Sequence, residues 1–127
     1  MSYNILVVDD SKVIRDSLRV IFEAEGYKVD SAENGADALD KARENKYSGI
    51  ITDVFMPVMD GYEFIKRVRG IDGYNSVPII IITVEEEIRM HREKGLHAGA
   101  NIYLAKPTEP KKLVTNMKML LGESLER

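Results

Sequence analysis

The sequence predicts an α/β fold, a doubly wound parallel sheet of five strands with helices on both faces. Five short apolar runs alternate along the chain with five segments whose apolar residues recur at helical spacing. Several of the runs are rich in Val, Ile and Leu, which is typical of strands buried on both faces of a parallel sheet. Strands that alternate with helices imply parallel strands joined by helical crossovers.

The composition agrees with one globular domain over residues 1–127. Hydrophobic residues make up 44% of the chain and charged residues 31%, which is enough apolar material for one core. The net charge of −3 argues against a broad nucleic-acid interface, and the absence of cysteine excludes disulfides and thiolate metal sites. The N-terminus does not resemble a signal peptide, and the longest apolar run, residues 77–84, is too short to span a bilayer. We therefore expect a cytoplasmic protein that does not bind membranes.

The first three predicted elements are a strand, a helix and a strand. Residues 5–8 form an uninterrupted apolar run. Ser11 is a helix-capping residue type that precedes a helical pattern over residues 12–25, and Gly26 should end that helix. Residues 27–32 alternate between apolar and polar side chains, which predicts a half-exposed strand near an edge of the sheet.

The middle of the chain repeats this order. A second helix is predicted over residues 36–44 and a third strand over residues 49–52. The loop over residues 54–61 contains Pro57 and an Asp-Gly pair, both of which favour turns. A third helix is predicted over residues 62–69.

The last elements are two further strand and helix pairs. Residues 77–83 form the most hydrophobic strand, which we expect to be the most central. The helix over residues 85–98 opens with three glutamates, at the end where the helix dipole favours negative charge. A fifth strand follows over residues 101–105, and Thr108 should cap a last helix that has Pro110 in its first turn.

Polar residues gather where these strands end. Functional sites in parallel sheets lie at the carboxyl ends of the strands. The residues there are Asp9 and Asp10, Asp53, Thr83 and Lys106. In the flavodoxin-like strand order 2-1-3-4-5 the first and third strands are neighbours, so the three carboxylates can converge. Such a cluster requires a cation and suits Mg²⁺, while lysine and hydroxyl groups suit phosphate oxygens. A carboxylate can itself act as the nucleophile that forms an aspartyl phosphate.

Together these motifs resemble the receiver domain of two-component response regulators, of the stand-alone CheY type. Each motif is weak alone and has a commoner structural role, such as a helix cap or a turn, but their joint order is specific and covers essentially the whole chain. The motifs are Val7-Val8-Asp9-Asp10, Asp53-Val54-Phe55-Met56-Pro57 with Asp60-Gly61, Ile82-Thr83, Gly99-Ala100 and Tyr103-Leu104-Ala105-Lys106-Pro107.

The resemblance implies a metal-assisted phosphoryl acceptor. Asp53 would take a phosphoryl group from a sensor histidine kinase or a histidine phosphotransfer domain. Asp10 and Asp53 would bind Mg²⁺ directly together with the backbone carbonyl of Phe55, and Asp9 would reach the ion through water. The chain is then a signalling domain rather than an enzyme, although it would assist its own phosphorylation and dephosphorylation.

The resemblance also implies a switch. Lys106 would pair with the phosphoryl group, Thr83 would hydrogen-bond to it, and Tyr103 would turn inward behind it. The Lys106–Pro107 peptide bond is expected to be cis. Phosphorylation would alter the face formed by the fourth helix, the fifth strand and the fifth helix, so that it binds a downstream protein. We expect no output domain, no direct contact with nucleic acid, and a monomer or a phosphorylation-dependent dimer.

Other functions fit the residues less well. A phosphatase with an aspartyl nucleophile at the first strand needs Asp-x-Asp, but Ser11 stands at the second position. A flavin-binding domain needs a phosphate loop at the same place, where Asp9 and Asp10 would repel phosphate. A receiver-like interaction module that is never phosphorylated remains the open alternative.

Three positions, Val84, Phe55 and Glu85, depart from the usual pattern of this family, and one glycine bears on a predicted helix. Val84 follows Thr83 where a smaller residue is usual, so its side chain could narrow access to a phosphoryl group. Phe55 and Glu85 occupy positions that tune phosphoryl lifetime, and a bulky apolar Phe55 suggests a long-lived state. Gly95 lies inside a predicted helix at a cost of about 1 kcal/mol relative to alanine. It either eases movement of that helix or marks its end.

Overall fold

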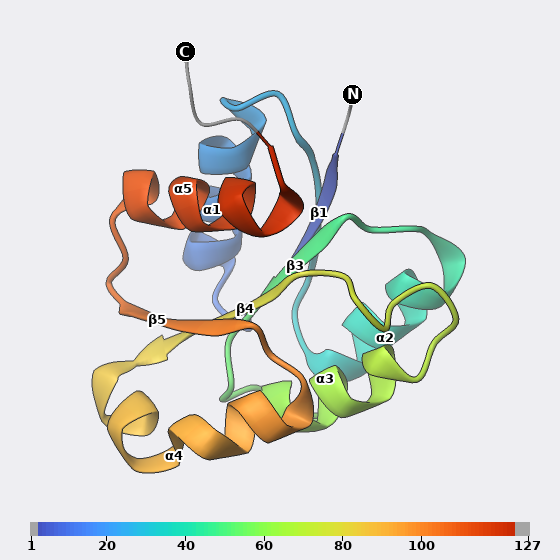
Figure 1. Ribbon diagram of the computed structural model, residues 1–127, viewed down its shortest axis with the longest axis vertical. Coiled ribbons are helices and arrows are strands. Elements are labelled where there is room, and N and C mark those ends of the chain that lie inside the picture. Colours follow the sequence, from blue (N-terminus) through green and yellow to red (C-terminus); the bar gives the residue numbers. More distant parts are fainter. Residues whose placement is uncertain (1–2, 124–127) are drawn as a thin grey trace.

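The five strands form one parallel sheet in the order β2-β1-β3-β4-β5, in a computed structural model that describes residues 3–123 (Figure 1). The strands are β1 (Asn4–Val8), β2 (Lys28–Ala32), β3 (Gly49–Thr52), β4 (Ile79–Val84) and β5 (Ile102–Lys106). This order confirms the predicted flavodoxin-like topology and the position of β2 at an edge.

Helices cover both faces of the sheet. They are α1 (Lys12–Glu23), α2 (Gly35–Glu44), α3 (Gly61–Arg69), α4 (Glu85–Ala98) and α5 (Pro110–Leu121). Leu6 and Val8 of β1 belong to the core beneath α2, α3 and α4, whereas Ile5 and Val7 belong to the core beneath α1 and α5. Alternate residues of one strand therefore enter two separate cores, which is why this strand is apolar throughout.

Two expectations about the second half of the chain are wrong. The middle strand is β3, not the more hydrophobic β4, because hydrophobicity reports burial on both faces and both inner strands share it. Thr108 does not cap α5. Its hydroxyl donates to the carbonyl of Ala105 at 2.6 Å, and Glu109 occupies the N-cap position without a side-chain hydrogen bond.

Helix boundaries agree with the prediction to within two residues. Ser11 caps α1 by accepting a hydrogen bond from the backbone N–H of Ile14, and Gly26 ends the following turn with φ of +87°. Gly95 does not end α4, which continues to Ala98, although the helix is kinked at His91. Across residues 3–123, no helix combines the length and the apolar character that crossing a membrane requires.

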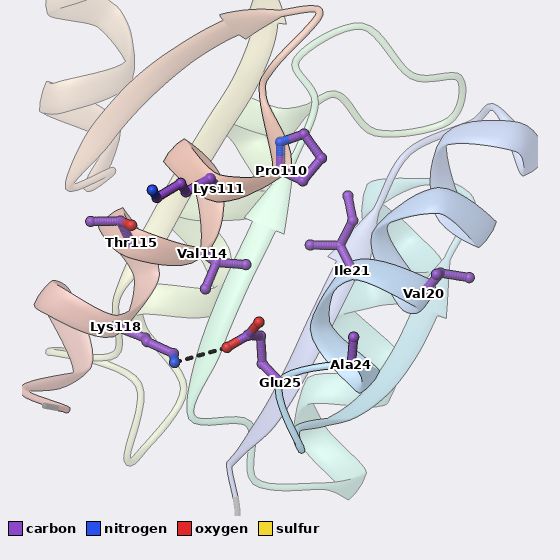
Figure 2. Close-up of a pocket in the computed structure, with 9 residues that line it drawn as sticks. All are labelled: Val20, Ile21, Ala24, Glu25, Pro110, Lys111, Val114, Thr115 and Lys118. Atoms are coloured by element: carbon purple, nitrogen blue, oxygen red, sulfur yellow. Dashed lines mark ion pairs between the residues drawn. The ribbon is translucent and has the colours of Figure 1, made fainter. Parts of the chain in front are cut away.

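A buried ion pair joins α1 and α5. A groove of about 420 Å³ separates these helices, and Figure 2 shows Lys118 of α5 directed across it toward Glu25, which follows α1. The Lys118 Nζ and a carboxylate oxygen of Glu25 lie 2.8 Å apart, and their side chains are 8% and 33% exposed. Lysine is rarely so buried without a partner. Glu25 is therefore needed to balance the buried charge of Lys118.

Replacing Glu25 should therefore destabilise the fold. We expect Glu25→Ala to lower the free energy of unfolding by about 1–3 kcal/mol, less than for a fully buried pair because Glu25 is partly exposed. Adding Lys118→Met should restore most of the loss by removing the unpaired charge. Urea denaturation measures both. Glu23→Ala is the matched control, since its pair with Arg19 is exposed and worth less than about 0.5 kcal/mol. Equal losses for Glu23→Ala and Glu25→Ala would contradict this account.

Candidate functional site

Three carboxylates meet at the carboxyl edge of the sheet. The parallel register pairs Val8 with Thr52, so Asp9 and Asp53, the next residues, lie side by side. Both are buried, whereas Asp10 is exposed. One carboxylate oxygen from each of the three lies within 4.8 Å of the others. Like charges at this distance favour a bound cation.

Lys106 supplies part of that positive charge. Its Nζ, at the end of β5, lies 2.8 Å from the Oδ2 atoms of both Asp9 and Asp53. Burial disfavours the ammonium form of Lys106, but hydrogen bonds and charges from Asp53 and Asp9 outweigh it, so its pKa lies above the ordinary value. One ammonium group among three carboxylates leaves net negative charge at the site.

The second oxygen of each buried carboxylate is held by the backbone. Oδ1 of Asp53 accepts a hydrogen bond from the N–H of Val54 at 2.7 Å. Oδ1 of Asp9 accepts one from the N–H of Ser11 at 2.9 Å. Each carboxylate is therefore oriented from two sides, with its Oδ2 atom directed toward the shared centre.

Thr83 contributes a hydroxyl with no hydrogen-bond partner among the described residues 3–123. The residue is fully buried near the end of β4, the strand beside β3. Buried polar atoms are nearly always paired, so this hydroxyl is a candidate donor to a ligand oxygen. The donor set fits a phosphoryl group, and the three carboxylates fit Mg²⁺, which prefers oxygen ligands.

None of the other predicted side chains contacts the carboxylates or Lys106 through a hydrogen bond within residues 3–123. Tyr103 of β5 already points inward, and its hydroxyl contacts α4 and α3. Phe55, on the loop after β3, has a 57% exposed side chain. Val84 is 48% exposed. The Lys106–Pro107 peptide bond is cis.

Three supporting residues escaped the sequence analysis. The hydroxyl of Thr52 donates to the carbonyl of Asp53 at 2.8 Å, and Arg15 donates to the carbonyl of Asp9 at 2.8 Å. Gly61 packs so closely that a Cβ there would overlap the carbonyl oxygen of Asp53. Of the three, only Gly61 was part of a sequence motif, Asp60-Gly61, and that motif predicted a turn rather than a contact with Asp53. Asp60 itself caps α3 by accepting from the N–H of Glu63.

Comparison with known proteins agrees with this geometry. The chain is 36% identical over 121 residues to the probable transcriptional regulator ycf29 of Porphyra purpurea, and 38% identical over 121 residues to the response regulator MprA of Mycobacterium tuberculosis. These alignments cover 95% of the chain but 57% and 51% of the relatives, so the chain spans about half the length of the curated relatives it matches.

Solved structures show the same fold over nearly the whole chain. The chemotaxis response regulator CheY4 of Vibrio cholerae aligns with a TM-score of 0.88 and 36% identity, covering 94% of this chain and 99% of that one. The receiver domain of the sensor histidine kinase PA1611 of Pseudomonas aeruginosa, described with magnesium in its active-site cleft, aligns with a TM-score of 0.88 and 31% identity, covering 97% and 100%. The family model for the response regulator receiver domain matches residues 5–118. The chain therefore belongs to the receiver domain family of two-component response regulators.

Proposed function

We propose that residues 1–127 act as one receiver domain that accepts a phosphoryl group on Asp53 from a phosphohistidine in the cytoplasm. The observation that carries this proposal is the oriented Asp53 carboxylate, 2.8 Å from Lys106. The adjacent strand β4 contributes the buried Thr83 hydroxyl, which has no partner within residues 3–123. The donor is a sensor histidine kinase or a histidine phosphotransfer domain.

The transfer needs no added base on this chain. The Asp53 carboxylate is an anionic nucleophile, so its oxygen forms the new O–P bond while the N–P bond of the phosphohistidine breaks and the imidazole keeps the electron pair. Lys106 would exchange its contact with a carboxylate oxygen for one with the phosphoryl group. The Thr83 hydroxyl would gain an acceptor that it otherwise lacks.

Mg²⁺ belongs to the same proposal. Asp10 and Asp53 would hold it directly with the Phe55 carbonyl, and Asp9 through water. When bound, the ion offsets the charge of the acids and of the transferred group. The protein's part is to keep the carboxylates in place, and the backbone bonds to Asp9 and Asp53 do so.

The output would be a change on the face formed by α4, β5 and α5. Lys106 and Tyr103 belong to β5, and Thr83 precedes the first turn of α4. A phosphoryl group bound by Thr83 and Lys106 therefore biases these elements between two packings. The face would then bind a downstream protein or a second copy of the chain.

Phosphorylation at Asp53 is tested by intact mass. After incubation with Mg²⁺ and acetyl phosphate, we expect wild type to gain one phosphoryl group and Asp53→Asn to gain none. Asp60→Asn is the matched control, because Asp60 lies on the same loop but caps α3, and it should gain the group as wild type does. If wild type gains no mass at any Mg²⁺ concentration, the unphosphorylated interaction module becomes the better explanation.

Two buried threonines should respond to mutation with opposite signs. Thr83→Val removes an unpaired hydroxyl and should raise the free energy of unfolding by roughly 1 kcal/mol, while Thr52→Val leaves the carbonyl of Asp53 without its partner and should lower it by about 1–2 kcal/mol. Both side chains are fully buried, so each controls for the other. Urea denaturation without Mg²⁺ measures them. Destabilisation by both would mean that Thr83 has a partner in the free protein.

The phosphoryl group should persist for minutes or longer. Phe55 follows Asp53 by two residues, and its ring would hinder an attacking water. We expect Phe55→Asn to shorten the half-life several-fold, as followed by mass after removal of the phosphodonor. A half-life of seconds in wild type would exclude this role for Phe55.

A further inference from the structure

The Tyr103 hydroxyl lies within the hydrogen-bond ladder of α4. In a regular helix the N–H of Gly95 would donate to the carbonyl of His91, four residues earlier. Here the N–H of Gly95 donates to the Tyr103 hydroxyl at 3.1 Å, and that hydroxyl donates to the His91 carbonyl at 2.9 Å. The backbone at His91 leaves the helical region, with φ of −134° and ψ of 28°. An inserted side-chain group is an established cause of a helix kink, so a residue of β5 shapes the backbone of α4.

Gly95 makes this insertion possible. A Cβ at this position would overlap the Tyr103 hydroxyl and would lie 2.8 Å from Cδ1 of Ile81. The glycine thus neither ends α4 nor marks a loose point in it. It leaves the space that an inward Tyr103 occupies.

Tyr62 of α3 supports Tyr103 from the other side. The two hydroxyl oxygens lie 3.0 Å apart, and Tyr62 donates to the Glu87 carboxylate in the first turn of α4. The Nζ of Lys94, also on α4, lies 4.8 Å from the centre of the Tyr62 ring. Burial and hydrogen bonding to Glu87 raise the pKa of Tyr62 well above its ordinary value, so its proton is retained. Tyr62 therefore contacts α4 at two points and Tyr103 at a third.

We propose that Tyr62 is a positioning residue that keeps Tyr103 inward, and α4 kinked, before any phosphoryl group is bound. The inward Tyr103 and the kink of α4 are then already present in the free protein. Phosphorylation adds the contact to Thr83 rather than the movement of Tyr103. The role of Tyr62 is argued from the contacts alone, whereas the statement about phosphorylation rests on the proposed function.

Nuclear Overhauser spectroscopy of the full chain tests the inward position. Without phosphodonor, we expect a strong cross-peak between the Gly95 Hα protons and the Tyr103 ring. We expect its intensity to change less than two-fold when beryllofluoride and Mg²⁺ are added as a phosphoryl analogue. A cross-peak that appears only with beryllofluoride would overturn the proposal. If beryllofluoride changes no amide chemical shift near Asp53, the proposed function fails. The cross-peak in the free protein still shows whether Tyr103 points inward.

A double-mutant cycle tests the contribution of Tyr62. We expect Tyr62→Phe and Tyr103→Phe to be non-additive by about five-fold in the unfolding equilibrium constant, because the two hydroxyl groups are in contact and belong to one network with Glu87 and His91. Tyr47→Phe is the matched control, since Tyr47 also donates to a carboxylate, that of Asp30 at 2.6 Å, but outside this cluster. Its combination with Tyr103→Phe should be additive. Additivity of Tyr62→Phe with Tyr103→Phe would remove Tyr62 from the proposal.

Discussion

The ammonium group of Lys106 between the carboxylates of Asp9 and Asp53 is the interaction on which the site depends. Two buried acids at neighbouring strand ends repel each other, and the lysine offsets this repulsion with contacts of 2.8 Å to each. The arrangement is possible only because β1 and β3 pair in a register that places both acids beyond the last apolar residues. The apolar sheet thus brings negative charge to one edge, and the Lys106 side chain of β5 offsets part of it.

The charges at this edge do not balance, because three carboxylates surround one ammonium group. Asp10 adds a third carboxylate within 4.8 Å, which favours a divalent cation. The two buried threonine hydroxyls near this edge also differ from each other. Thr52 and Thr83 are both fully buried near the ends of adjacent strands. Within residues 3–123 only the Thr52 hydroxyl has a partner, the backbone carbonyl of Asp53. One threonine therefore supports the site, while the other is left for a ligand.

The fold and the positions of the site residues could be predicted because they depend on pattern. Apolar runs located the strands, and the acids, Thr83 and Lys106 stand where those runs end. The failures have two causes: contacts between distant segments and one competing local hydrogen bond. Hydrophobicity could not separate β4 from the true middle strand, and Thr108 had a nearby carbonyl to bind instead of a helix N–H. The roles of Tyr62 and Gly95 were invisible because each depends on the position of Tyr103, which lies on another element.

The construction of α4 explains why this helix is suited to respond to the site. Its buried residues are only Ile88, Gly95 and Ala98, two of which contribute little apolar area. Hydrogen bonds from Tyr62 to Glu87 and from Tyr103 to the His91 carbonyl also attach α4 to the rest of the protein. A hydrogen bond contributes little net free energy when its partner can be replaced by another polar group or by water. A helix attached in this way loses few apolar contacts when it shifts. Under the proposed function, the change in charge at the site would therefore act on a helix that few apolar contacts hold.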